Sequence, residues 1–309
     1  MRVKLTILLL SIIATSATSW TQDAEDTLKQ FEGKTMILLH PLLSGSQRYD
    51  AEGKVLKGGG NEGSWALYAG VLIDRVTLTS EKLRLEGRRI FFVFPKQKLT
   101  LLEFTQHGHH GSPPFSPSLN VEVTLGKPLD SSEQALTALS RVFALKAENF
   151  LETLPDFWRE YLVNHHFSYD PFQKKEAEYR WREEVDTQGR TGQDSQPDLA
   201  KDSNDSELRE RVVYPIGTGS GVKAPNPIHT PAPEFSSISQ YENYQGIALV
   251  NVVVGTDGKA HRIRLLRALG MGLDEIALST VRTWRFQPAT RNGQPVAVEM
   301  NIEVAFNMF

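Results

Sequence analysis

The chain has 309 residues, a formal net charge of −3, and 40% hydrophobic and 23% charged residues. These values are typical of a soluble globular protein of about two domains. The sequence contains no cysteine, which excludes disulfides, thiolate metal sites, iron–sulfur clusters and cysteine nucleophiles. The slightly negative charge argues against nucleic acid as the main partner, because nucleic-acid-binding proteins usually concentrate positive charge.

Residues 1–19 have the pattern of an export signal. Arg2 and Lys4 precede the apolar run LTILLLSIIA, and small residues follow it just before Trp20. About ten apolar residues are too few to span a bilayer, which needs roughly 20. We therefore expect a cleaved signal peptide and a mature protein in an exported compartment, with an uncleaved membrane anchor as the alternative.

Residues 26–166 are predicted to form a β-rich accessory domain that ends in helices. The segment 34–39 is typical of a strand, and long alternating stretches follow it. A helix is expected after a cap at one of residues 130–132, and Pro155 should interrupt a second helix. Turns are expected at Glu52-Gly53, Ser80-Glu81, Glu86-Gly87 and Pro95-Lys96.

Residues 167–222 differ in composition from the rest of the chain. They are rich in charged residues, glutamine and serine, and they lack apolar residues at either helical or strand spacing. This composition predicts a linker. The GTGSG run (217–221) has the glycines of a phosphate loop but no following lysine, so a hinge is the better interpretation. A proline-rich extended stretch follows at 224–235.

Residues 223–309 are predicted to fold in the order β-β-α-β, a three-stranded antiparallel sheet with a packed helix. Asp257-Gly258 and Asn292-Gly293 suit two-residue hairpin turns. Asp274 and Glu275 fall in the first turn of the helix, where acidic side chains are favourable to the helix dipole. With the strands-then-helices order of residues 26–166, the whole chain is predicted to be α+β. The expected core of the C-terminal domain consists of Leu273, Ile276, Val281, Trp284 and Phe286.

The closing strand alternates apolar and polar residues from 296 to 306. Period two over this length indicates a strand with one dry and one wet face. A long strand that closes a chain is often an edge, and its backbone can pair with a partner strand. A covered edge and a homodimer contact remain as alternatives. The candidate peptide-binding residues are Val296, Ala297, Val298, Glu299, Met300, Asn301, Ile302, Glu303 and Val304.

Residues 246–306 resemble the TonB C-terminal domain. The resemblance rests on the order of the pieces: a hairpin at Asp257-Gly258, the helix, the run VRTWRFQPA, and the Asn292-Gly293 turn before an alternating strand. Upstream, PAPEFSSIS is similar to the family's Pro-x-Tyr-Pro lead-in, although phenylalanine and serine replace its tyrosine and second proline. Residues 26–166 also resemble an accessory β-rich domain found before some TonB-like C-termini.

The resemblance implies a periplasmic protein that takes part in transport across the outer membrane. TonB domains grip a short peptide of outer-membrane transporters, the TonB box, which adds as a strand to the last strand of the domain. A full energy transducer of this family also has an anchor that meets a motor of the ExbB–ExbD type. Residues 1–20 contain no histidine, and the spacer lacks the usual proline repeats, so the resemblance implies peptide binding more firmly than energy transduction.

Three histidines, His107, His109 and His110, lie in a glycine- and proline-rich stretch. Histidines at this spacing can bind a metal, and a metal-dependent hydrolase is one hypothesis. An exposed loop is the better interpretation because no acidic residue or fourth ligand lies nearby in the sequence. No catalytic pattern stands out elsewhere, so we expect a protein that is not an enzyme and has no cofactor or metal.

Two charged stretches are expected to be ordinary surface. The segment LRLEGRRIFF carries three arginines, which Glu81 and Glu86 balance in number. Near the closing strand, Arg282 and Arg285 are expected to face water. His165-His166 is expected at a helix end, where a protonated imidazole suits the dipole.

Overall fold

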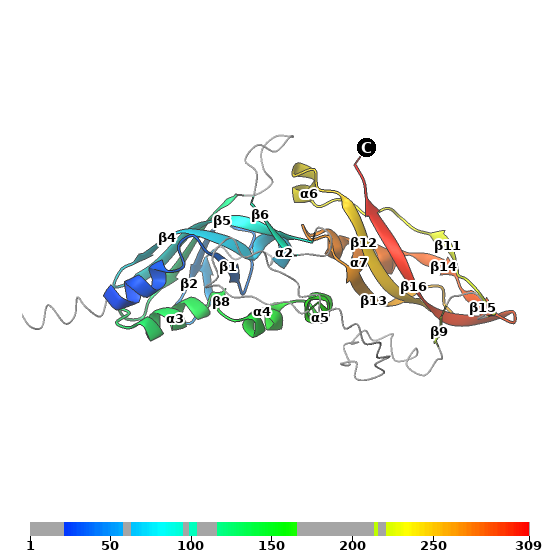
Figure 1. Cartoon of the computed structure of the whole chain (residues 1–309), viewed down its shortest axis with the longest axis horizontal. Helices are drawn as coiled ribbons and strands as arrows, with labels where there is room; N and C mark the ends of the chain where they lie inside the picture. Colours follow the sequence, from blue (N-terminus) through cyan, green and yellow to red (C-terminus); the bar gives the residue numbers. More distant parts are fainter. Residues whose placement is uncertain are drawn as a thin grey trace, which may run out of the picture.

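The computed structural model describes residues 22–57, 63–94, 99–103, 116–165, 213–215 and 221–308. It contains two large β-sheets, each covered by helices, which lie next to each other along the long axis of the molecule (Figure 1). In the described residues no helix combines the length and the apolar character needed to cross a membrane. The predicted signal, the Pro95-Lys96 turn, the three loop histidines, His166 and most of the predicted linker lie outside the described residues.

The N-terminal sheet has the strand order β3-β2-β7-β5-β4-β1-β8, with β6 beside β5. The pair β2–β7 is parallel and the other pairs are antiparallel, so the sheet is mixed. Its strands are β1 (Thr35–Leu38), β2 (Ser46–Tyr49), β3 (Val55–Lys57), β4 (Gly70–Leu78), β5 (Lys82–Val93), β6 (Thr100–Glu103), β7 (Ser118–Thr124) and β8 (Phe143–Ala144).

Helices cover this sheet, and those that follow residue 130 lie where the sequence predicts them. The helical segment 22–29 and α3 (Ser132–Ser140) pack their apolar side chains onto one face. The Ser131 hydroxyl accepts the Gln134 amide at the start of α3, as expected of a capping residue. Pro155 separates α4 (Ala147–Thr153) from α5 (Asp156–Asn164), and the short α2 spans Trp65–Tyr68. His165 caps the end of α5, as predicted.

The predicted turn at Glu86-Gly87 is wrong. Strand β5 continues through both residues, and Gly87 pairs with Ile73 of β4. A Cβ atom at Gly87 would lie 2.5 Å from the Leu72 carbonyl oxygen. This glycine therefore serves the close approach of two strand backbones rather than a change of direction.

The C-terminal sheet has the order β10-β15-β16-β12-β13, with β9 beside β16, and β11 pairs separately with β14. Strands β13, β12 and β16 with helix α7 form the predicted three-stranded sheet and packed helix. The elements are β9 (Val213–Pro215), β10 (Val222–Lys223), β11 (Asn226–His229), α6 (Ser237–Tyr241), β12 (Gly246–Val254), β13 (Ala260–Arg267), α7 (Leu273–Thr283), β14 (Arg285–Gln287), β15 (Ala289–Arg291) and β16 (Gln294–Phe306).

Helix α7 packs against the inner face of this sheet. Leu273 and Val281 are fully buried and Phe286 is buried, whereas Ile276 and Trp284 are partly buried at the rim of the core. Leu278 also belongs to the core, in addition to the residues expected from the sequence. The Trp284 indole donates to the Pro231 carbonyl, and thereby fixes the proline-rich segment beside the helix end.

The two predicted hairpin turns differ. Asn292 and Gly293 both have positive φ (52° and 81°), as a two-residue turn of the predicted kind requires. At the other turn Gly258 alone has positive φ (74°), and the Gly255 amide donates to the Lys259 carbonyl at 3.0 Å. The turn between β12 and β13 is therefore one residue longer than predicted, a form that needs a single left-handed glycine.

The N-terminal and C-terminal parts share a joint, formed by residues 92–94 and 269–271. The Phe94 amide donates to the Leu269 carbonyl at 2.9 Å, and the Met271 amide donates to the Phe92 carbonyl at 3.1 Å. Leu265 and Ala268 of the C-terminal part are buried in an aromatic cluster built from the N-terminal part. Residues that are far apart in sequence thus form one continuous core across the joint.

Two acidic residues at the start of α7 support the joint. Asp274 lies in the first turn as predicted but is fully buried, and its carboxyl oxygens accept the amides of Leu269 (2.8 Å) and Gly270 (2.6 Å). Burial raises the pKa of Asp274 well above the ordinary range, and the neighbouring Glu275 adds to the rise. Glu275 accepts hydrogen bonds from the Ser64 hydroxyl and the Trp158 indole of the N-terminal part.

Candidate peptide-binding edge of β16

The closing strand β16 has the two faces that the sequence predicts. Val298, Ile302, Val304 and Phe306 are buried against the core under α7, and Glu299, Asn301, Glu303 and Ala305 are exposed on the opposite face. Ala297 is an exception on the outer face, being only 2% exposed. Val253 and Val213 cover it.

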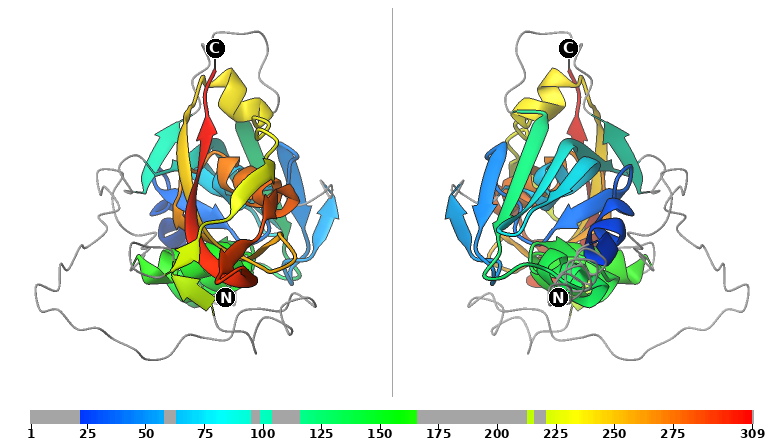
Figure 2. Two further views of the ribbon diagram at one scale, coloured as in Figure 1. Left: turned by 90° about the vertical axis from the view of Figure 1, so that its right-hand side faces the viewer. Right: turned by 90° about the vertical axis from the view of Figure 1, so that its left-hand side faces the viewer.

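The candidate binding residues at the start of β16 already have neighbouring strands in the structure. Strand β12 pairs with Val298 to Phe306, β15 pairs with Gln294 to Val296, and β9 pairs with Ala297 to Glu299. The unexpected neighbour is β9, because its residues belong to the segment predicted as a linker. Figure 2 shows β16 in red running beside β12 toward the C-terminus.

The hairpin between β12 and β13 determines which backbone groups of β16 are already bonded. The amide and carbonyl of Gly255 both face β13, because they bond to Lys259 and Gly258 at 3.0 Å each. Backbone direction alternates along a strand, so Val254 and every second residue before it face β16. Val254 pairs with Val298 in a register that continues without a shift. The even-numbered residues of β16 therefore bond to β12.

The odd-numbered residues of β16 direct their amides and carbonyls to the other side, which we call the outer edge. Strand β9 occupies this edge at residues 297–299. No strand in the described part of the chain pairs with the outer edge beyond Glu299. The backbone groups of Asn301, Glu303 and Ala305 are thus available to an added strand.

Side chains on both faces shape what this edge can accept. On the outer face Asn251 donates to the Asn301 side chain at 2.9 Å, and Glu303 lies 3.6 Å from Arg267 while remaining 65% exposed. On the inner face Phe235 packs against Phe306, with ring centroids 5.6 Å apart. An added strand would therefore meet polar and acidic groups on one face and apolar groups on the other.

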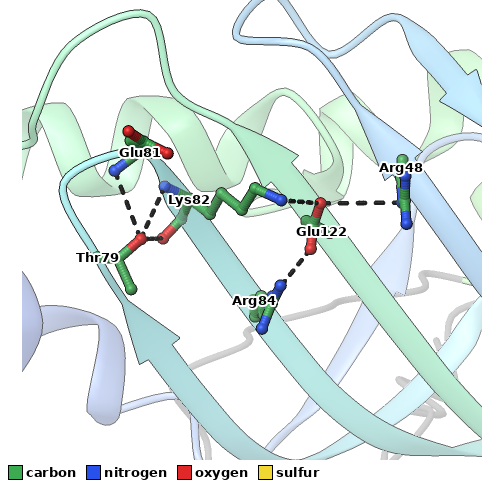
Figure 3. Close-up of polar contacts among 6 residues, drawn as sticks. All are labelled: Arg48, Thr79, Glu81, Lys82, Arg84 and Glu122. Atoms are coloured by element: carbon green, nitrogen blue, oxygen red, sulfur yellow. Dashed lines mark hydrogen bonds and ion pairs between the residues drawn. The ribbon is translucent and has the colours of Figure 1, made fainter.

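Apart from this edge, a cluster of charged side chains lies on the polar face of the N-terminal sheet (Figure 3). Glu122 of β7 accepts hydrogen bonds from Lys82 (2.9 Å) and Arg84 (2.8 Å) and lies 3.8 Å from Arg48. The hydrogen bond from Lys82, followed by that from Arg84, lowers the pKa of Glu122. The cluster ties β2, β7 and β5 together across their exposed side chains.

The arginines of LRLEGRRIFF are therefore balanced by other residues than predicted. Arg84 pairs with Glu122, and Arg88 pairs with Asp74 and Glu103. Arg89 is fully buried rather than solvated, and its pKa is lowered to about 10 by burial. Its guanidinium donates to the carbonyls of Leu42, Leu43, Ser44 and Tyr68.

The described residues contain no cluster of three histidine, aspartate or glutamate side chains suited to a metal ion. Residues 231–308 match the family model of the Gram-negative bacterial TonB protein C-terminal domain. The chain carries a TonB C-terminal domain. The match includes the helix α7, the outer edge of β16 and the lead-in at Phe235.

Two known proteins are similar to part of the chain. The protein tonB2 of Pseudomonas aeruginosa is 27% identical over 82 residues, which cover 26% of this chain and 30% of that protein. The chain therefore matches less than a third of the length of this relative. A solution NMR structure of the Pseudomonas aeruginosa TonB C-terminal domain is 20% identical and covers 30% of this chain and 93% of that one, with a TM-score of 0.24.

Proposed function

We propose that this protein is a periplasmic TonB-like protein whose C-terminal domain binds the TonB box of outer-membrane transporters by strand addition at the outer edge of β16. The observation that carries the proposal is the row of outward-facing backbone groups at Asn301, Glu303 and Ala305, which no strand of the described residues pairs with, in a domain that matches the TonB family. Strand addition takes its affinity from such main-chain groups.

The position of the edge supports this function. The even-numbered residues hold β16 in the sheet through β12, so a partner can pair with the odd-numbered ones without disturbing the domain. Each main-chain hydrogen bond contributes about 0.5–1.5 kcal/mol net. Bonds to three residues therefore give a weak, readily reversible grip, which suits a contact that must form and release.

A proline at Glu303 tests the proposal. Its amide faces the outer edge, so Glu303→Pro removes one donor without removing a bond to β12, and proline is tolerated on an edge whose amides face solvent. Glu303→Thr is the matched control, because it removes the same carboxylate and keeps the amide. Binding is measured with a synthetic TonB-box peptide from a transporter of the same bacterium, by fluorescence anisotropy.

We expect Glu303→Pro to bind the peptide about tenfold or more weakly than Glu303→Thr, since about 1.4 kcal/mol corresponds to a factor of ten. Circular dichroism establishes that both variants are folded. Equal affinities in two folded variants would show that the peptide does not pair with this edge.

Self-association through the same edge is the second candidate function. An antiparallel pair of copies centred on Glu303 would place the two Glu303 carboxylates opposite each other, and like charges directly opposite are destabilising. This feature disfavours the symmetric dimer. Sedimentation showing a concentration-dependent dimer that loses affinity for the peptide would favour it over transporter binding.

Energy transduction through a motor of the ExbB–ExbD type is a further part of the proposed role. It requires the N-terminus to remain in the inner membrane. Mass spectrometry of the protein from envelope fractions tests this requirement. A mature start near Trp20 in the soluble fraction would remove the direct coupling, and an intact Met1 in the inner-membrane fraction would support it.

A further inference from the structure

Strand β9 is a short piece of the chain that lies on the proposed peptide edge. It runs parallel to β16, with Val213 opposite Ala297, Tyr214 opposite Val298 and Pro215 opposite Glu299. Since β12 holds the other edge of β16 at Val298 and Glu299, β9 lies on the outer edge. Along β16, the residues that β9 covers come just before residues 301–305, whose outward-facing backbone groups no described strand pairs with.

The side chains of β9 alternate across the sheet like those of a bound peptide. Val213 packs on the outer face against Val253 and Ala297. Tyr214 points to the inner side and packs against the core cluster beneath α7, and the Arg291 guanidinium lies 4.9 Å from the centre of its ring. The edge therefore already accepts an aliphatic side chain on one face and an aromatic side chain on the other.

The hold on β9 is limited by its own sequence. Because Ala297 and Glu299 direct their backbone groups to the outer edge, only Tyr214 of β9 directs its amide and carbonyl toward β16 in this parallel register. Val213 and Tyr214 are only half-buried, and parallel pairing is slightly less stable per residue than antiparallel pairing. Three residues with these properties form a contact that a competing strand can replace.

We propose that β9 is a tethered occupant of the peptide edge, which an external strand must displace to pair with β16 over its full length. The strand class that the edge selects is then the one β9 shows: parallel to β16, with a branched aliphatic residue on the outer face and an aromatic residue beside Arg291. The inference rests on the proposed function. It adds the side chains that a bound strand should carry, and it adds that β9 competes with that strand for the edge.

The test uses the full chain and a fluorescein-labelled synthetic peptide of residues 209–216, RERVVYPI. The double variant Val213→Asp/Tyr214→Asp removes both anchoring side chains of β9. Ile228→Asp is the matched control, since it places a charge on an exposed apolar residue of β11 that is 70% exposed. A peptide of the same composition in scrambled order controls for non-specific binding.

We expect the double variant to bind the labelled peptide about threefold or more tightly than the wild type, because a short tether presents its strand at an effective concentration of about a millimolar. Ile228→Asp should match the wild type, and the scrambled peptide should bind neither. Equal affinity of wild type and double variant for the peptide would overturn the inference.

A second double variant tests the inference even if the first one does not fold. Val213→Cys/Ala297→Cys places two cysteines opposite each other in a chain that has no others. Oxidation, checked by mass, should lock β9 on the edge and weaken binding of the peptide of residues 209–216, and reduction should restore its affinity. Binding that is unchanged by oxidation to the disulfide contradicts a displaceable β9.

The same measurements separate the inference from the proposed function. If Glu303→Pro weakens the affinity for a TonB-box peptide but displacing or locking β9 does not change the affinity for any peptide, the proposed function stands and the inference fails. If the peptide of residues 209–216 competes with β9 while no TonB-box peptide binds, the inference stands and the proposed partner is wrong.

Discussion

A methyl group at Gly270 should force apart the two parts of the molecule at their joint. Gly270 has a φ of 83° and lies opposite Val93 at the end of β5. A Cβ atom there would lie 2.7 Å from the Val93 Cα and would overlap the Phe92 carbonyl oxygen. Both obstacles are backbone atoms, so Gly270→Ala can be accommodated only if β5 and the loop before α7 separate.

The magnitude follows from what the separation breaks. Alanine in the left-handed region costs roughly 1–2 kcal/mol by itself. Separation also loses the two backbone hydrogen bonds of the joint, those donated by Phe94 and Met271, worth about 1 kcal/mol each. Gly293→Ala provides the matched control, since Gly293 has a φ of 81° but a Cβ added there would meet no atom of another segment within 4 Å.

The expected result is that Gly270→Ala is about 2 kcal/mol or more less stable than Gly293→Ala, because the control shares the strain but not the clash. Chemical denaturation gives this difference, and amide hydrogen exchange locates it. The amides of Phe94 and Met271 should exchange faster in Gly270→Ala alone. Equal stability of the two variants, with both amides still protected, would show that the joint does not depend on this close approach.

Two further predictions concern buried ionisable side chains. Arg89→Met leaves the carbonyls that the guanidinium binds without a donor and should cost roughly 3 kcal/mol or more of unfolding free energy, whereas Arg84→Met at the exposed cluster should cost no more than about 1 kcal/mol; similar losses in denaturation would contradict the buried role of Arg89. Asp274 has a raised pKa in the folded chain, so the stability from its protonation is present at acidic pH and is lost as the pH rises through that pKa. Relative to Asp274→Asn, the wild type should therefore become more stable on acidification, and parallel pH profiles of the two would refute this.

The joint changes the role expected of the segment between the two parts. From sequence alone, a polar linker would leave two domains free to move relative to each other. In the structure, Glu275 receives hydrogen bonds from Ser64 and Trp158, and β5 reaches the loop before α7. Direct packing therefore fixes the relative position of the two parts.

Short-range patterns predicted those parts of the fold that depend on neighbours in sequence. The period-two strand, the Asn292-Gly293 turn and the spacing of α7 each follow from the geometry of a single element. The buried position of Arg89 follows from the alternation along β5: from residue 83 to residue 89 the odd-numbered residues, such as Leu83 and Leu85, are buried and the even-numbered ones are exposed. Counting charges in the segment obscured the alternation that places Arg89 inside.

The extent of the open edge of β16 could not be predicted in the same way, because side-chain alternation specifies the faces of a strand and carries no information about which residues have neighbours along its edges. Which amides of β16 are free depends on the hairpin at Gly255 and on β9. Strand β9 contributes only Val213 and Tyr214 as apolar contacts within a polar segment, too few to show a period. A segment of that kind pairs only where an edge is already available, so its strand conformation is a consequence of β16 rather than of its own sequence.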